Sequence, residues 1–259
     1  MRDFLEEAYE HRQDGYGRAQ AANRVPLLKR FYKTVTVGPV ESGFAILLDG
    51  KNMKTPGGKP VHVPNAALAE AMAREWEAQE TEIDFRHMPL VRLAHSAIES
   101  GAEGAQAFRD EIVKYAGNDL LLYRADSPES LVEAQENAWD PVLTSLARHY
   151  DVAFQPTVGV IHQPQPVSTL DRLAEVVAVE DHMALAALMQ IVSLTGSALL
   201  TLAYRQGLID SQSVWSAAHV DEDHNTRLWG EDDEATRRRA QRFVEFSAAG
   251  DMLGALKAN

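Results

Sequence analysis

Residues 31–64 read FYKTVTVGPVESGFAILLDGKNMKTPGGKPVHVP, and this stretch decides the fold class. Segment 31–37 is rich in β-branched and aromatic residues, a composition typical of strands, and the strand pattern resumes after Gly43 at residues 44–48. A third short strand is expected at 61–63. Since turn residues separate these segments, we expect residues 30–64 to form a small antiparallel β unit.

Three turn signals divide this unit. Gly38-Pro39 is expected to end the first strand. Asp49-Gly50 favours a tight two-residue hairpin, because glycine tolerates the positive φ that such a turn requires. A further turn is expected at residues 55–58.

From Asn65 onward, apolar residues recur at helical spacing. We expect Asn65 to cap a helix, and Pro89 to be the first residue of another. A further helix should start after Ser127-Pro128 and kink or restart at Pro141, which lacks a donor for the carbonyl four residues earlier. Ser168 and Asp171 resemble a capping box. The later helices are expected at about 169–180, 182–193, 196–206, 210–226 and 233–256.

The change of period along the chain indicates an α+β protein. We expect a small antiparallel β-rich N-terminal domain that includes a helix, residues 1–87. A larger all-helical C-terminal domain, residues 88–259, is expected to follow.

Composition excludes several classes of protein. The 259 residues include 25 Lys and Arg, 38 Asp and Glu and no cysteine, giving a formal net charge of −13. Without cysteine there is no disulfide, thiolate metal site or cysteine nucleophile. An acidic chain lacks long-range attraction to phosphate backbones or anionic lipid. We therefore expect no nucleic-acid partner.

Membrane insertion and secretion are not expected either. Residues between His182 and Arg205 carry no formal charge, but Gln190, Ser193 and Thr195 interrupt the segment, which favours a buried helix pair. The first seven residues contain three acids, unlike a signal or transit peptide. These features predict a cytoplasmic protein.

Catalytic motifs are not evident. There is no glycine-rich phosphate loop and no Gly-x-Ser-x-Gly elbow, and Thr195-Gly196-Ser197 is typical of packing at a helix junction. Asp221, Asp223, Asn225 and Asp232 have calcium-loop spacing, but position six of that loop would be Thr226 instead of glycine. We expect no metal and no cofactor.

A series of short blocks together resembles a known family. They are Arg30-Phe31-Tyr32-Lys33, Leu48-Asp49-Gly50-Lys51, Lys54-Thr55-Pro56, Glu75-Trp76 with Gln79, Met88-Pro89-Leu90, Asp119-Leu120-Leu121-Leu122-Tyr123-Arg124, Gln135 with Trp139-Asp140-Pro141, Gly196-Ser197-Ala198-Leu199, and Asp221-Glu222 followed by Trp229-Gly230. In this order, over residues 30–235, they resemble the assembly chaperones that act on the alpha subunit of the ATP synthase catalytic head.

The resemblance implies a non-enzymatic chaperone with a β-rich N-terminal and a helical C-terminal domain. It implies that the chaperone holds the free alpha subunit, shielding the surface that faces the beta subunit, until the beta subunit replaces it. Relatives act in the mitochondrial matrix or in bacteria, and the N-terminus here resembles the bacterial branch. The family's important acidic position corresponds to Glu222.

The acidic segment around Trp229 is the expected partner surface, comprising Asp221, Glu222, Asp223 and Trp229. We expect Trp76 and Trp139, which lie on apolar helical stripes, to be core residues.

Two alternatives remain open at this point. One is a small-substrate hydrolase with a carboxylate or histidine centre between the two domains. The other is a metal-binding regulatory domain using the 219–225 cluster.

Overall fold

The computed structural model describes residues 27–257, which divide between two compact units. One unit contains residues 27–31 and Gln79–Asp84, and the other contains Tyr32–Ala78 and residues 85–257. The first seven residues, which bear on the expected location, lie outside the described residues. The domain boundary after residue 87 stays a prediction.

The first unit is held by a short antiparallel pair. Strand β1 (Leu28–Lys29) pairs with β6 (Glu82–Ile83), and the Arg30 N–H donates to the Thr81 carbonyl at 3.0 Å.

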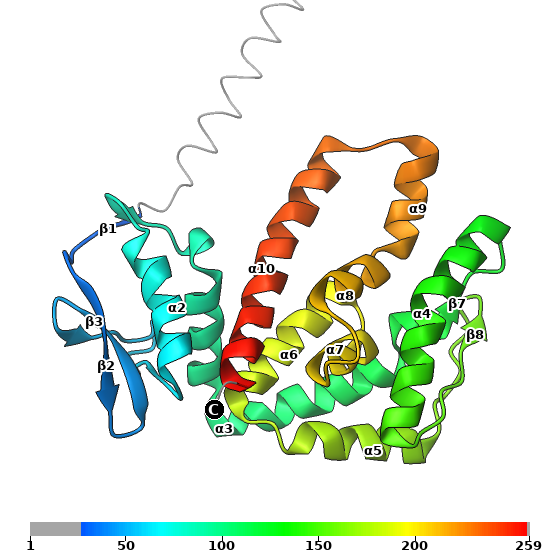
Figure 1. Ribbon diagram of the computed structural model, residues 1–259, viewed down its shortest axis with the longest axis horizontal. Coiled ribbons are helices and arrows are strands. Elements are labelled where there is room, and N and C mark those ends of the chain that lie inside the picture. The colour runs from blue at the N-terminus through cyan, green and yellow to red at the C-terminus, as the bar shows by residue number, and fades with distance from the viewer. Residues whose placement is uncertain (1–26, 258–259) are drawn as a thin grey trace, which may run out of the picture. The chain divides into compact units, whose positions relative to one another are not determined.

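The second unit opens with the antiparallel sheet that the sequence predicts (Figure 1). The Asp49-Gly50 hairpin is confirmed: β3 pairs Leu48 with Lys51 of β4, and φ is 49° at Asp49 and 76° at Gly50. The strand order is β2-β3-β4, and β5 also pairs with β3. The strands are β2 (Val35–Val40), β3 (Gly43–Leu48), β4 (Lys51–Asn52) and β5 (His62–Val63).

The limits expected for the first strand are wrong. It begins at Val35, because the Asp49 carboxylate accepts the backbone N–H groups of Lys33 and Thr34 at 3.0 and 2.9 Å. It then continues through Gly38-Pro39 to Val40. Proline is tolerated there because β2 is an edge strand whose Pro39 has no ladder bond to make.

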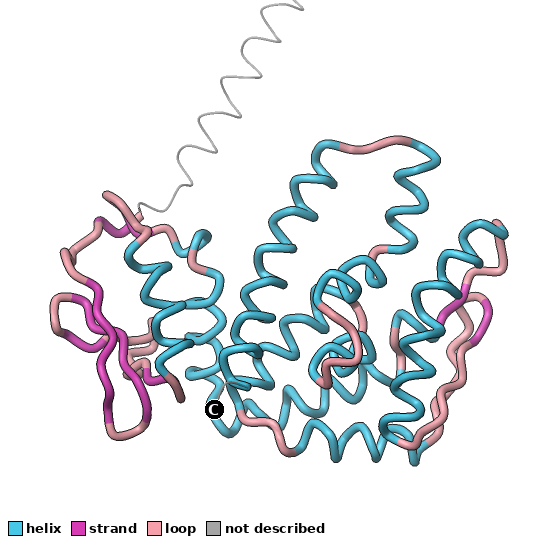
Figure 2. The backbone as a smooth tube through the Cα atoms, in the orientation of Figure 1, coloured by secondary structure: helices cyan, strands magenta, loops and turns pink. Residues whose placement is uncertain are grey.

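Helices make up most of the second unit, which confirms the α+β class (Figure 2). A parallel pair of two-residue strands, β7 (Tyr123–Arg124) and β8 (Thr157–Val158), lies among them. The helices are α2 (Ala66–Glu77), η1 (Phe85–His87), α3 (Pro89–Gly117), η2 (Leu120–Leu122), α4 (Glu129–Tyr150), α5 (Val167–Ala178), α6 (His182–Thr195), α7 (Ala198–Arg205), α8 (Ser211–Ala218), α9 (Val220–Trp229) and α10 (Asp233–Lys257).

Two helix starts are confirmed. The Asn65 side chain accepts the Leu68 N–H at 3.0 Å, and Pro89 is the first residue of α3. The capping box at Ser168 is wrong, since α5 begins at Val167 after Pro166 and has no side-chain cap.

Two helix interruptions differ from expectation. The restart at Pro141 does not occur, because α4 runs without a break through that residue. The expected helix 210–226 is instead two helices that divide at His219, whose φ of −119° and ψ of 20° are not helical. The buried His219 ring packs on Trp215, four residues earlier, with ring centroids 4.2 Å apart. Trp215 in turn contacts Phe243 and Phe246 of α10, and these tertiary contacts have no counterpart in a sequence pattern.

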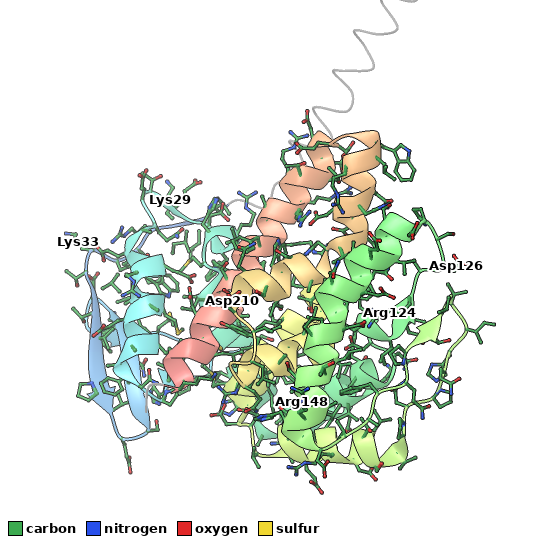
Figure 3. The ribbon with its side chains drawn as sticks, turned by 45° about the vertical axis from the view of Figure 1, so that its right-hand side comes forward. Lys29, Lys33, Arg124, Asp126, Arg148 and Asp210 are labelled. Carbon is green, nitrogen blue, oxygen red and sulfur yellow. The ribbon has the colours of Figure 1, made fainter. Side chains whose placement is uncertain are left out.

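The core confirms the buried tryptophans. Trp76 and Trp139 are buried, and the Trp139 indole N–H donates to the Ala217 carbonyl at 2.8 Å. Arg124, labelled in Figure 3, covers the Trp139 ring at 5.1 Å and donates to Asp140 at 2.7 Å. The Arg124 and Trp139-Asp140 sequence blocks therefore meet in one structural contact.

A second pair of blocks meets at the start of α3. The Glu75 carboxylate, on α2, accepts the N–H groups of Leu90 at 2.9 Å and Val91 at 2.8 Å. These donors belong to the first turn of α3, where Pro89 and the N-cap residue Met88 offer no side-chain cap. Burial of this carboxylate raises the pKa of Glu75.

A third pair of blocks meets at the fully buried Asp119. Its carboxylate accepts the Ser197 hydroxyl at 2.7 Å and the Leu199 N–H at 2.9 Å, both at the start of α7, and the Leu121 N–H at 3.1 Å. Burial is the largest influence on this group and raises the pKa of Asp119 from 3.8 to about 6, although the hydrogen bonds oppose it.

This burial predicts a pH-dependent stability. Since the pKa of Asp119 is raised on folding, ionisation between pH 4 and 7 lowers the free energy of unfolding, by up to about 3 kcal/mol. Asp119→Asn removes this titration but also removes one acceptor, so we expect it to be less stable overall. Urea unfolding should show that the variant has a lower free energy of unfolding than the unsubstituted protein, and that this difference shrinks as pH rises from 4 to 7.5. Equal pH slopes for the two proteins would contradict this account.

Candidate functional site

All four predicted partner residues lie on α9, beyond the His219 break (Figure 1). Three carboxylates occupy the first turn, where the partial positive charge of a helix N-terminus stabilises them. The helix ends at Gly230, whose φ of 88° favours glycine. One side of α9 packs against α4.

Asp221 serves the contact with α4. Its Oδ1 accepts a hydrogen bond from the buried Gln135 Nε2 at 2.8 Å, and Gln135 Oε1 accepts the Ala125 N–H at 2.8 Å. This polar chain fixes α9 on α4 and orders the loop before α4. Asp221 therefore has a structural role, because its carboxylate is bound to Gln135 of α4.

Asp223 serves the contact with α10. Both of its carboxylate oxygens accept hydrogen bonds from the Arg239 guanidinium. These bonds raise the pKa of Arg239. The pair is partly exposed, so we expect it to contribute no more than about 1 kcal/mol to stability.

Glu222 points outward, with 60% of its side chain exposed. Its nearest charged or titratable contact is His219 Nε2, at 3.7 Å. Burial is the largest influence on the His219 ring and lowers its pKa, so the imidazole is neutral at pH 7. His219 consequently brings no positive charge to Glu222.

Trp229 is 79% exposed, as its place in the expected partner surface requires, and its neighbour Leu228 is exposed as well. Glu222 and Trp229 are seven residues apart, two helical turns, and so share one stripe of α9. We call the stripe from Glu222 to Trp229 the α9 surface. It combines a large apolar ring with an exposed carboxylate on a helix that is anchored on its other side.

Residues that support this surface escape prediction from sequence. Gln135 belongs to a quoted block but reads as one member of a helical stripe, and Arg239 is one of several arginines at 237–242. His224 is buried, and its Nε2 lies 2.9 Å from the Ser130 hydroxyl on α4. Only the tertiary structure reveals these contacts.

The alternatives find little support in this region. A groove of about 440 Å³ between α4 and α9 is lined by Ala134, Ser216, Val220, Asp223, Thr226 and Arg227, and Asp223 is already paired there. Ser197 is fully buried as the cap of α7 and cannot meet a substrate as nucleophile. Among residues 27–257, no three histidine, aspartate or glutamate side chains are grouped to hold a metal ion.

Within the described ranges, no helix is both long enough and apolar enough to cross a bilayer. The uncharged segment between His182 and Arg205 forms α6 and α7 and is largely buried.

Comparison with known proteins agrees with the resemblance drawn from the sequence blocks. Residues 29–147 match a family described as ATP12 chaperone protein. The mitochondrial protein atp12 of Schizosaccharomyces pombe is 24% identical over 218 residues, which are 79% of this chain and 75% of that protein.

Solved structures extend the similarity. A putative chaperone from Agrobacterium tumefaciens is 42% identical with a TM-score of 0.86, over 92% of this chain and 90% of that one. Atp12 from Paracoccus denitrificans is 38% identical with a TM-score of 0.83, over 88% of this chain and 97% of that one. The expectation of an ATP synthase assembly chaperone is thereby confirmed at the level of the family. The chain belongs to the ATP12 chaperone family.

Proposed function

We propose that this chaperone binds the unassembled alpha subunit of the ATP synthase catalytic head and shields the surface that later faces the beta subunit. The α9 surface is the proposed contact. The observation that supports it most is the exposure of Trp229 on the stripe that carries Glu222, on a helix fixed to α4 through Asp221. A fixed helix presents these groups with little loss of entropy on binding.

The composition of the α9 surface suits a temporary holder. An unassembled subunit exposes apolar surface that promotes aggregation, so a holder must cover such a patch. A single exposed tryptophan supplies much binding energy, while a rim carboxylate contributes orientation and association rate. Such an interface can release its client to a larger and more apolar partner surface.

We further propose that the chain acts without catalysing a reaction and resides in the bacterial cytoplasm. The burial of Asp119 and Ser197 supports the first point, since the carboxylate with the pKa near 6 and its hydroxyl partner are closed to substrate. The second rests on the similarity to chains from Agrobacterium tumefaciens and Paracoccus denitrificans. The relative from S. pombe carries a mitochondrial name.

Capture of isolated alpha subunit tests the function, and Glu222→Lys tests the site. The full chain should retain alpha subunit in a pull-down, and Glu222→Lys should weaken capture about tenfold, since it reverses an exposed charge at the contact. Glu103→Lys, an exposed glutamate on α3, is the control with the same charge change. A normally folded chain that captures no alpha subunit would refute the function. If Glu222→Lys instead lowered the melting temperature and lost capture together, Glu222 would have a structural role.

Trp229→Ala should weaken capture more strongly, by about thirtyfold or more, because it removes the largest apolar group of the α9 surface. Its melting temperature should stay within about 1 °C, since the ring is mostly exposed. Val179→Ala, at another exposed apolar side chain, controls for general loss of surface hydrophobicity. Unchanged capture by Trp229→Ala would remove this ring from the contact.

Asp221→Ala, in contrast to Trp229→Ala, should lower the stability of the fold. It leaves the buried Gln135 amide without its acceptor, so we expect the free energy of unfolding to fall by about 1–3 kcal/mol. Urea unfolding measures this change, with Glu222→Ala as the neighbouring control. An unchanged unfolding midpoint would show that the Gln135 contact adds no stability.

A further inference from the structure

A second open groove lies between strand β2 and helix α2, away from the α9 surface in sequence. Figure 1 labels both elements. It has a volume of about 790 Å³. Residues 33–37 form one wall, and Glu70, Ala73, Arg74 and Glu77 form the other. These four helix residues fall at intervals of three and four and so share one face of α2.

The strand wall offers unpaired backbone groups. β2 is the edge of its sheet, with β3 on one side and no other described strand on the other. The Asp49 N–H donates to the Thr34 carbonyl at 3.0 Å, and bonded pairs alternate along an antiparallel ladder. The N–H and C=O groups of Val35 and Val37 therefore point away from β3, along the groove.

The direction of the groove is fixed at one end. The Tyr32 hydroxyl, just before β2, donates to the Trp76 carbonyl near the end of α2 at 2.7 Å, and the two rings meet edge to face. The strand wall thus runs from the end of α2 back toward its start. This anchor holds both walls in place without a ligand.

The helix wall carries charge in a fixed order. In the described part of the chain, neither the Glu70 side chain nor the Arg74 side chain has a hydrogen bond or ion pair. Four residues of helix separate them by about 6 Å along the axis, and alternate residues of a strand are about 6.7 Å apart. An extended segment on the groove can therefore place a basic side chain beside Glu70 and an acidic one beside Arg74.

We propose that this groove binds an extended segment of the client subunit, which pairs with β2 as an added strand. The segment carries a basic and an acidic side chain two residues apart, facing α2. Pairing with a sheet edge supplies main-chain hydrogen bonds, and the charges of the helix wall supply selectivity. The identity of the client rests on the proposed function, whereas the groove is a separate contact from the α9 surface.

Amide hydrogen exchange tests the added strand directly. In the complex of the full chain with isolated alpha subunit, the Val35 and Val37 amides should exchange at least tenfold more slowly than in the free chain. The Thr36 amide already faces β3 and should change less. Capture of alpha subunit without slowing at Val35 and Val37 would overturn the groove proposal and leave the proposed function standing. Failure to capture alpha subunit would refute both.

Charge reversal tests the helix wall. Arg74→Glu should weaken capture about fivefold and reduce the slowing at Val35 and Val37. Arg148→Glu makes the same charge change at an exposed site on α4 (Figure 3) and should leave both readouts unchanged. Equal effects of the two variants would overturn the charge order proposed for the segment. The Val35 and Val37 amides could instead exchange more slowly at higher protein concentration without any client. That result would assign the groove to a second copy of this chain and would also overturn the proposal.

Discussion

Two carboxylates, the fully buried Asp119 and the partly buried Glu75, hold the helical architecture together by accepting the free N–H groups at the start of another helix. Asp119 accepts donors at the start of α7, and Glu75 accepts donors at the start of α3. Unpaired donors at a buried helix start are costly, so each carboxylate satisfies a requirement that the local sequence leaves open. Removing water from a charge is also costly, which is why burial raises the pKa of both groups.

The same arrangement positions the candidate site. Asp119 fixes the start of α7, and the chain then passes through α8 to the break at His219 and into α9. Gln135 and Ser130 of α4 hold Asp221 and His224 on one side of α9. What α9 leaves exposed is therefore determined by which of its side chains α4 and α10 engage.

Sequence predicts the fold well where structure is local. The Asp49-Gly50 hairpin, the Asn65 cap and the buried Trp139 follow from turn chemistry, capping and periodicity. The break at His219 was not predicted, since α9 takes its direction from contacts of Asp221 and His224 with α4, which are distant in sequence. The start of α5 was placed too late, because Pro166 and not Ser168 precedes its first turn. For the candidate site, the exposure of Trp229 was predictable. That Asp221 and Asp223 bind other helices while Glu222 stays exposed was not predictable. Three adjacent acids look alike in sequence, and only their partners on other helices distinguish them.

Pro39 has a consequence for how far another chain can pair with the β2 edge. An open strand edge invites identical chains to pair edge to edge and grow into aggregates. Proline lacks the N–H that the next outward-facing position would need, so pairing along β2 stops after Val37. Two copies joined there could share only a short ladder, too little for a lasting assembly. Pro39 thus limits self-polymerisation along β2, while the backbone groups of Val35 and Val37 stay available for pairing.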